Sequence, residues 1–200
     1  SLQYLNISNN VLTSFPFGKN GFKELETLDL TQNLIRQDVF MVLDGLSSIK
    51  NLLLSNNFFY GSIPNTIRSL ARMEKLHLDN NRLIGTIPDD VLSLVRLREL
   101  KLSHNRQERQ CFLWITKCGG KIYQGGDLCC DGDNGEQVCT DQLGVDSVGL
   151  LDVCLLPGLH GTIPAGFTNT PYLRVLDLSS TWLIGNIPPE IGGLSRLEVL

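Results

Sequence analysis

Leucine positions recur along this chain with a period of 24 residues. Leu52 lies 24 residues before Leu76, and Leu76 lies 24 residues before Leu100. Leu28 precedes Leu52 by the same step. A fixed period in the twenties indicates a solenoid, in which every repeat adds one coil. Because a single coil buries few side chains, its stability must come from stacking on its neighbours.

The stretch from Leu76 to Leu102 shows what each coil contains. Leu76 and Leu78 alternate with polar residues, which predicts a short strand with one buried and one exposed face. Asn81 follows where the chain must turn, and its amide can hydrogen-bond backbone groups that the turn leaves inside the coil. We therefore expect one strand per coil and a ladder of stacked asparagines.

The second half of the coil predicts an extended segment and a helical return. Gly85 permits a backbone geometry that a side chain would obstruct, and Pro88 fixes φ, so the chain is expected to run extended and then bend. Val91, Leu94 and Leu97 follow at a spacing of three, which favours a 3₁₀ or short helical turn. This turn should lie on the side opposite the strands.

The combined pattern, L-x-x-L-x-L-x-x-N-x-L-x-G-x-I-P, resembles the leucine-rich repeat family, and G-x-I-P is typical of its plant-type subclass. The resemblance covers about residues 1–105 and 150–200. It implies an α/β fold: a horseshoe-shaped solenoid with a parallel β-sheet on the concave face and short or 3₁₀ helices on the convex side. The G-x-I-P element stands at residues 61–64, 85–88, 161–164 and 185–188.

The period is interrupted between Leu100 and Leu176. Residues 161–164 stand one period before the last G-x-I-P element. We therefore expect a further coil around residues 151–173. In strict register Asp152 would be buried, so a slip of one residue that buries Leu151 and Val153 is the better interpretation.

Three parts are expected along the chain. Residues 1–105 and 147–200 would be leucine-rich repeats, and residues 106–146 a cysteine-rich insertion. The chain opens within a coil and ends within a strand, without the polar caps that repeat arrays normally carry. We therefore expect it to be a piece of a longer array.

All six cysteines lie between residues 111 and 154. An even number in an irregular segment predicts disulfides that staple a loop with no core of its own, and hence an extracellular or secretory location. Pairing between the neighbours Cys129 and Cys130 is disfavoured by disulfide geometry. A zinc site is disfavoured because the segment has neither a C-x-x-C pair nor a histidine. The predicted disulfide cysteines are Cys111, Cys118, Cys129, Cys130, Cys139 and Cys154.

Motifs of catalysis are absent from the sequence. It has no G-x-S-x-G, H-E-x-x-H or phosphate-binding G-x-x-x-x-G-K element, so we expect neither an enzyme nor a cofactor. The net charge of −4 does not indicate binding to nucleic acid. The longest apolar run, around residues 148–156, is too short to span a membrane. Membrane attachment is expected only through parts outside this sequence.

Outward-pointing side chains of successive strands should form columns on the concave face, and these columns are the candidate binding surface for a protein, peptide or glycan. Tyr4 and Leu53 are the sharper candidates, because they are apolar or aromatic where solvent is expected. The alternative is an ordinary solvated face. Asn6 begins the only N-x-S/T sequon and is a candidate glycosylation site. The ligand-binding candidates are Tyr4, Asp29, Leu53, Lys75, His77, Asp79, Glu99, Lys101 and Asp177.

Three functions stay open. The resemblance most often implies the ectodomain of a receptor-like protein or receptor kinase, in which the array holds a ligand and other parts signal. A second possibility is a secreted enzyme inhibitor or defence protein similar to polygalacturonase-inhibiting proteins. The third, an intracellular scaffold, is opposed by the predicted disulfides.

Overall fold

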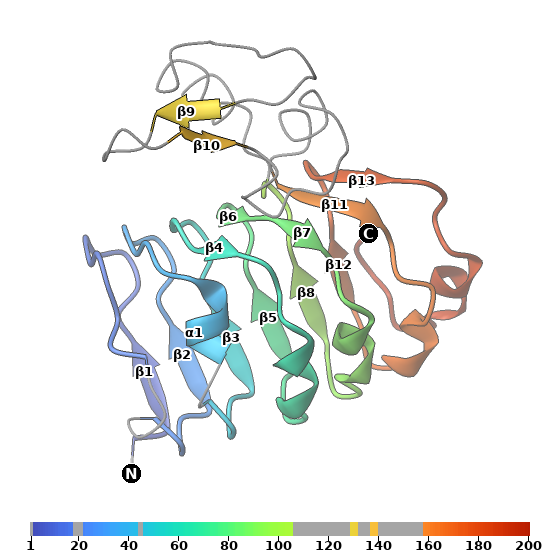
Figure 1. Cartoon of the computed structure of the whole chain (residues 1–200). Coiled ribbons are helices and arrows are strands. Elements are labelled where there is room, and N and C mark those ends of the chain that lie inside the picture. Colours follow the sequence, from blue (N-terminus) through green and yellow to red (C-terminus); the bar gives the residue numbers. More distant parts are fainter. Residues whose placement is uncertain (1, 18–21, 44–45, 106–128, 132–136, 140–157) are drawn as a thin grey trace. The chain divides into compact units, whose positions relative to one another are not determined.

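The structure is a computed structural model and describes residues 2–17, 22–43, 46–105, 129–131, 137–139 and 158–200. The chain divides into two compact units, one of residues 1–106 with 158–200 and one of residues 107–157. In the first unit, short strands lie side by side in one parallel, six-stranded sheet (Figure 1). In sheet order these strands are β1 (Tyr4–Asn6), β2 (Thr27–Asp29), β3 (Asn51–Leu53), β5 (Lys75–His77), β8 (Glu99–Lys101) and β12 (Val175–Asp177).

The predicted leucine positions pair with one another across this sheet. Leu28 pairs with Leu52, and Leu52 pairs with Leu76. Leu76 pairs in turn with Leu100. All four side chains are fully buried. Pairing of equivalent residues at a fixed step is what a solenoid requires, so the predicted stacking of coils is confirmed.

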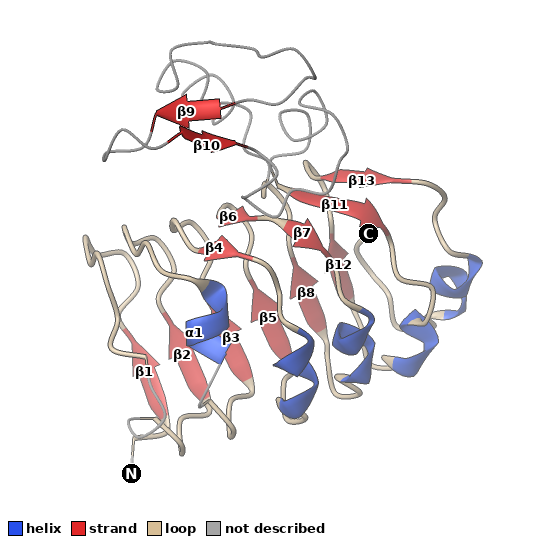
Figure 2. Cartoon of the chain, viewed as in Figure 1, coloured by secondary structure: helices blue, strands red, loops and turns tan. Residues whose placement is uncertain are grey.

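Short helices lie on the side of the first unit opposite the sheet (Figure 2). The spacing of three predicted a 3₁₀ or short helical turn after Pro88, and the 3₁₀ helix Asp89–Ser93 confirms it. Val91 and Leu94 are fully buried there. The second coil has an α-helical turn instead, which buries Val39, Val42 and Leu43. The described helices of this unit are α1 (Val39–Leu43) and the 3₁₀ helices η1 (Asn65–Ser69), η2 (Asp89–Ser93), η4 (Phe167–Asn169) and η5 (Pro189–Gly193).

The extended segments that follow the asparagines pair in additional small parallel sheets. β6 pairs with β4, and β11 lies between β7 and β13. The sequence predicted that these segments are extended, but not that they pair. Because coils stack at the spacing of neighbouring strands, the free N–H and C=O groups of adjacent segments come within hydrogen-bonding reach. These strands are β4 (Tyr60–Gly61), β6 (Arg82–Leu83), β7 (Gly85–Thr86), β11 (Leu159–Thr162) and β13 (Trp182–Ile184).

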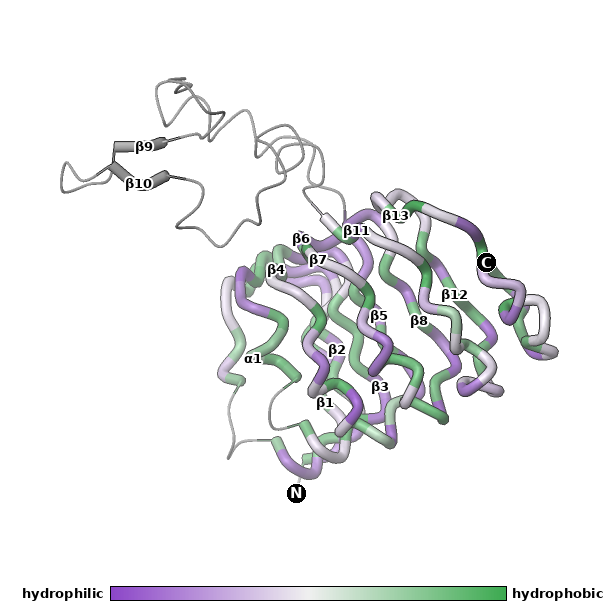
Figure 3. Tube along the Cα trace, turned by 45° about the vertical axis from the view of Figure 1, so that its right-hand side comes forward, coloured by the Kyte–Doolittle hydropathy of each residue, from purple (hydrophilic) through white to green (hydrophobic). Residues whose placement is uncertain are grey.

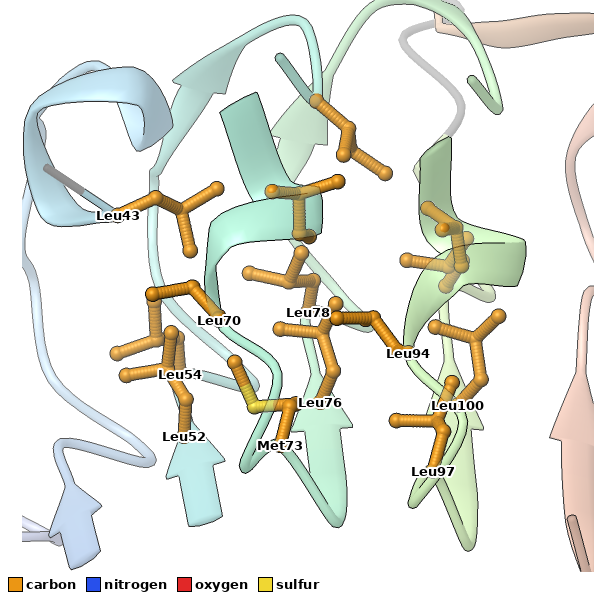
Figure 4. Packing of buried hydrophobic residues seen from close by; sticks show 14 of the residues in the cluster. Leu43, Leu52, Leu54, Leu70, Met73, Leu76, Leu78, Leu94, Leu97 and Leu100 are labelled. Carbon is orange, nitrogen blue, oxygen red and sulfur yellow. The ribbon is translucent and has the colours of Figure 1, made fainter. Parts of the chain in front are cut away.

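Apolar side chains from the sheet and from the helical side meet inside each coil. Leu76 and Leu78 reach the interior from β5 and the residue that follows it, and Leu70, Met73 and Leu94 reach it from the other side (Figure 4). None of the five is more than 2% exposed. Along the coils, hydrophobic and hydrophilic stretches alternate (Figure 3). Full burial of one leucine side chain contributes roughly 1.5–3 kcal/mol, so this shared core is the main source of stability.

A ladder of asparagines joins neighbouring coils. Asn81 Nδ2 donates to the carbonyl oxygens of Leu54 (3.0 Å) and Leu78 (3.1 Å). Its Oδ1 accepts a hydrogen bond from the Phe59 N–H (2.9 Å). Each asparagine thus satisfies backbone groups of its own coil and of the preceding one, and the predicted ladder is confirmed. Equivalent bonds are made by Asn33, Asn57 and Asn105.

One prediction about the middle of the chain is wrong. A further coil was expected between Leu100 and Leu176, with its strand at residues 151–153, but β12 pairs directly with β8 and sets Leu176 opposite Leu100. Residues 151–153 lie outside the described residues. The direct pairing leaves no position for a strand between β8 and β12, so the G-x-I-P element at 161–164 does not belong to an additional coil of this sheet.

Residues 158–164 complete the coil that β8 opens. The Leu159 N–H donates to the Asn105 carbonyl oxygen (3.0 Å), and β11 pairs with β7 of the preceding coil. Leu159 is fully buried and takes the place that Leu83 has one coil earlier. Residues 99–105 and 158–164 therefore belong to one coil, although they are far apart in the sequence.

The second unit contains one described hairpin. β9 (Cys129–Asp131) pairs antiparallel with β10 (Gln137–Cys139), with Cys139 opposite Cys129 along the backbone. The predicted boundaries of the insertion, residues 106–146, and the predicted disulfides stay predictions. The remaining predicted disulfide cysteines, Cys111, Cys118 and Cys154, lie outside the described residues.

Candidate ligand-binding face

The candidate site is the outward face, which we define as the first and third residues of each strand of the six-stranded sheet. In β2, β3, β5, β8 and β12 the middle residue is buried and the two flanking residues are half-buried, so the flanking side chains point away from the core. The strand register aligns them in two columns, as predicted. These columns are Tyr4, Thr27, Asn51, Lys75, Glu99 and Val175, and Asn6, Asp29, Leu53, His77, Lys101 and Asp177.

Three candidates from β5 and β8 form what we call the Glu99 cluster: Lys75, His77 and Glu99. Lys75 Nζ lies 2.7 Å from Glu99 Oε1, and His77 Nε2 lies 2.9 Å from Glu99 Oε2. One carboxylate therefore holds two side chains of the neighbouring strand, each by one oxygen. The cluster exists because coil stacking brings residues 22 and 24 positions apart together.

Burial and the nearby Lys101 charge lower the pKa of His77 below its usual 6.5, although the Glu99 carboxylate acts in the opposite direction. Burial alone would raise the pKa of Glu99, but hydrogen bonds and positive charge from Lys75, and from His77, outweigh it and lower that pKa. Near neutral pH the cluster thus contains an ionised Glu99, a charged Lys75 and a neutral imidazole. The neutral imidazole donates to Glu99 through Nε2–H and leaves Nδ1 as an acceptor.

Lys101 extends the cluster on β8. It occupies the same column as His77 on one neighbouring strand and Asp177 on the other. Within the described part of the chain its side chain makes no hydrogen bond or ion pair, and the residue is half-buried. A partly desolvated cation without a partner attracts an anionic group more strongly than a fully solvated one. Lys101 is therefore the clearest point on the outward face for a ligand carboxylate.

Two aspartates near the Glu99 cluster, Asp177 on β12 and Asp79 two residues after His77, accept hydrogen bonds from serines. Asp177 accepts hydrogen bonds from the Ser103 and Ser179 hydroxyls, each 2.8 Å long. Burial would raise the pKa of Asp177, but these bonds, with the Ser179 N–H and the charge of His104, lower it. Asp79 likewise accepts from the Ser55 hydroxyl. Both carboxylates are therefore fixed in position, which reduces the entropy that a ligand contact must overcome.

The other candidates lie nearer the first strand. Tyr4 is 62% exposed on the edge strand β1, and β2 and β3 separate it from the Glu99 cluster. Asp29 accepts from Asn6 Nδ2 (3.3 Å) and from the Thr31 N–H (3.0 Å). Leu53 lies opposite His77 on β3 and is half-buried. The structure thus brings the lysine, histidine and glutamate candidates together with Leu53, and leaves Tyr4 apart.

A row of ion pairs just before the strands was missed from the sequence. The Lys50 ammonium lies 2.8 Å from the Glu26 carboxylate, and Arg98 Nε lies 3.2 Å from Glu74 Oε2. Arg174 contacts Glu198 at 2.7 Å. Opposite charges at a spacing of one coil were the available signal. The hydrogen bonds from Ser55 to Asp79 and from Ser103 to Asp177 were likewise not predicted.

In the part of the chain that the structure describes, no group of three His, Cys, Asp or Glu side chains is placed to hold a metal ion. Among the same residues, no helix has the length and apolarity needed to cross a membrane.

Family models of leucine-rich repeats match several coils of the first unit. The model described as Leucine Rich repeats (2 copies) matches residues 1–39, and the model described as Leucine Rich Repeat matches residues 48–70, 72–94 and 172–194. Together these matches cover more than half of the chain. The chain belongs to the leucine-rich repeat family. No curated protein matches it.

Solved structures of leucine-rich repeat receptor ectodomains are similar to this chain. The Arabidopsis receptor kinase HAESA, in complex with the peptide hormone IDA and the co-receptor SERK1, is 26% identical over 98% of this chain, with a TM-score of 0.68. The HAESA ectodomain with an N-terminally extended IDA peptide is 26% identical over 100% of the chain, with a TM-score of 0.69. The chain spans only 24% and 25% of those two HAESA chains.

A further structure shows likeness of fold alone. The ectodomain of the receptor kinase SOBIR1 from Arabidopsis thaliana is 21% identical over 83% of this chain, with a TM-score of 0.53. This chain covers 62% of that ectodomain. The leucine-rich repeat solenoid predicted from the period is thus shared with ectodomains of different length.

Proposed function

We propose that this chain is part of the ectodomain of a receptor-like protein or receptor kinase, and that its outward face holds a protein or peptide ligand. The observation that carries the proposal is the Glu99 cluster on β5 and β8 of the six-stranded face, together with Lys101, whose side chain has no partner among the described residues. Further support comes from HAESA, a receptor kinase whose similar ectodomain is in complex with a peptide hormone. Ligand recognition, without catalysis, is the function that fits.

The binding mode is an extended segment laid across the strands. Lys101 pairs with a carboxylate of the ligand, and Asp79 and Asp177 pair with basic or hydroxyl groups on either side. Leu53 offers an apolar contact next to His77. The peripheral candidates Tyr4 and Asp29 then contact the part of the ligand that reaches β1 and β2. Because a few anchors usually carry most of the binding energy, Lys101 and Leu53 are the residues to test first.

We extend the proposal to location and subclass. An extracellular location is supported by the clustered cysteines and by the similar receptor ectodomains. Membership of the plant-type G-x-I-P subclass is supported by the element's first residue. All four of these glycines have φ between 81° and 87°, a conformation that favours glycine. They are Gly61, Gly85, Gly161 and Gly185.

We also propose that Asn6 carries an N-linked glycan. Its side chain is exposed on β1, and its Oδ1 accepts from the Ser8 N–H (3.0 Å) and hydroxyl (2.8 Å). A glycan there would cover the β1 end of the outward face and confine ligands to the strands beyond β2. A mass shift on secretion that is lost in Asn6→Gln supports this, and an unmodified secreted chain contradicts it.

The test is selection of peptides from a phage-displayed random library on the full chain. Peptides that bind the outward face should be retained by the wild type and lost with Leu53→Glu, which places a charge beside His77. The matched control is Arg68→Glu, a charge change on the exposed helix η1. The proposal is contradicted if no peptide is enriched, or if the enriched peptides bind both variants equally.

A further inference from the structure

A second charged surface lies at the end of each coil, directly before the strand begins. In each coil, the residue directly before the first buried residue occupies the same structural position. The N–H of the residue that follows it closes a turn: Met73 N–H donates to the Leu70 carbonyl oxygen (2.9 Å), and Leu97 N–H donates to that of Leu94 (2.9 Å). We call the last four of these positions the arginine row. Its members are Arg72, Arg96, Tyr172 and Arg196.

Side chains of the row are neighbours in space. Because β5, β8 and β12 are adjacent in the sheet, the row follows the coils at the spacing of neighbouring strands, about 4.8 Å. The contact between its last two members confirms this, since the Arg196 guanidinium carbon lies 4.9 Å from the centre of the Tyr172 ring. Arg72 and Arg96 stand one coil apart in the same way, and both are exposed.

The positive charges of the row are not neutralised within the described part of the chain. Arg72 and Arg96 make no ion pair or hydrogen bond there. The acidic residues two positions further along the chain already have other arginine partners, because Glu74 pairs with Arg98 and Glu198 pairs with Arg174. The row on the other side is uncharged and consists of Ala71, Val95, Pro171 and Ser195.

This arrangement is unfavourable unless an anion binds. Like charges opposite one another on neighbouring strands are destabilising, and at physiological ionic strength charges are screened only beyond about 8 Å. The chain as a whole has a net charge of −4, so three exposed arginines in one row without an ion pair among the described residues depart from its average surface. A partner with regularly spaced negative charges would remove the repulsion, and guanidinium groups bind carboxylates by two parallel hydrogen bonds.

Tyr172 indicates what kind of polymer fits. The residue is 44% exposed and stands between Arg96 and Arg196 in the row, with the Arg196 guanidinium over its ring. Aromatic ring faces are negative and attract the weakly positive C–H groups of a sugar ring. An extended acidic peptide places side chains on one side only every second residue, roughly 6.6 Å apart, which does not match the coil spacing. A polymer of uronic acids instead offers a carboxylate and a flat C–H surface on every ring.

We propose that the arginine row binds a linear polysaccharide of uronic acids, with Arg72, Arg96 and Arg196 pairing to its carboxylates and Tyr172 packing on a sugar ring. This surface is separate from the outward face. The proposed polysaccharide binding can therefore be tested independently of the proposed receptor function.

The test is binding of polygalacturonate to the full chain at about 0.15 M salt. The triple variant Arg72→Gln, Arg96→Gln, Arg196→Gln should bind at least tenfold more weakly than the wild type. The matched control is Arg68→Gln, Arg98→Gln, Arg174→Gln, which removes the same charge from arginines that already have acidic partners. Its affinity should stay within threefold, about 0.7 kcal/mol. Circular dichroism of both variants should match the wild type.

Poly-L-glutamate separates the two classes of polyanion. Tyr172→Ala should weaken polygalacturonate binding by about threefold and leave poly-L-glutamate binding unchanged. The proposal is overturned if polygalacturonate does not bind, or if the two triple variants lose equal affinity. It is also overturned if poly-L-glutamate binds as tightly as polygalacturonate and neither depends on Tyr172, which would indicate an acidic protein segment instead.

Discussion

Replacing Asn81 by alanine tests the ladder that joins the coils. The side chain makes four hydrogen bonds to backbone groups, and the residue is only 6% exposed. In Asn81→Ala the Phe59 N–H loses the acceptor it has in the described structure, which costs about 1–3 kcal/mol. The Leu54 and Leu78 carbonyls each lose one of two side-chain donors. Asn57 Nδ2 remains 3.2 Å from the first and Asn105 Nδ2 2.9 Å from the second.

These losses together predict a decrease of roughly 2–4 kcal/mol in the free energy of unfolding. Urea unfolding followed by circular dichroism measures it, as a lower midpoint with an unchanged slope. The matched control is Asn65→Ala on η1, where the asparagine is exposed and makes no side-chain hydrogen bond in the described structure. The control should change stability by less than about 0.5 kcal/mol.

A double variant sharpens the test. The Leu54 carbonyl accepts from both Asn57 and Asn81, so it keeps one donor in either single variant and loses both when the two changes are combined. The combined loss should therefore exceed the sum of the single losses by about 1 kcal/mol. If Asn81→Ala unfolds like Asn65→Ala, or if the double variant is simply additive, the ladder does not act as described.

Three further perturbations follow from the structure. Leu76→Ala removes a fully buried side chain and should cost about 2–5 kcal/mol by urea unfolding, whereas a cost below 1 kcal/mol would contradict a close-packed core. Gly85→Ala forces alanine to φ +81°, with its Cβ 3.2 Å from the Ser62 Cβ, so the free energy of unfolding should fall by about 1–3 kcal/mol. The control is Gly192→Ala, because a Cβ added there meets nothing within 4 Å and the free energy of unfolding should hardly change. The pKa of His77 lies below 6.5 in the folded chain, so as the pH falls the unfolded chain takes up a proton at a higher pH than the folded chain does. The free energy of unfolding should therefore decrease as the pH drops below about 6.5, and this decrease should be smaller in His77→Gln. By NMR titration, Lys101→Met should raise the pKa of His77 and Glu99→Gln should lower it further, and the opposite signs would refute the assigned causes.

The period of the leucines was enough to predict the sheet, the buried strand positions and the asparagine ladder. Each depends on a side chain that must be apolar or an amide at a fixed place, as Leu76 and Asn81 must be. Pairing between extended segments, such as β4 with β6, depends on backbone groups that every residue carries, so side-chain identity gives no signal for it. The additional small sheets therefore could not be predicted in the same way.

The interrupted coil was misinterpreted because one observation fitted two arrangements. A G-x-I-P element one period before the last is required both by an additional coil and by a coil that is opened, interrupted and completed. Leu159, in the place that Leu83 has one coil earlier, fits both, since either coil needs an apolar residue two positions before its glycine. The direct pairing of β12 with β8 is what distinguishes them.

For the candidate site, the columns could be predicted but not the contacts within them. Strand register fixes which residues align, and it placed Lys75 and Glu99 side by side correctly. Whether Glu99 binds Lys75, His77 or both depends on side-chain conformations that alignment leaves open. That the Lys101 side chain has no partner among the described residues likewise becomes visible only once those residues are placed.

The most direct test of the central claim is calorimetric titration of the tightest selected peptide against Lys101→Glu and Arg68→Glu. If the outward face holds the ligand around Lys101, reversing that charge should weaken binding at least tenfold, about 1.4 kcal/mol, while the same reversal on η1 leaves the affinity unchanged. Equal affinity for the wild type and Lys101→Glu would contradict the account.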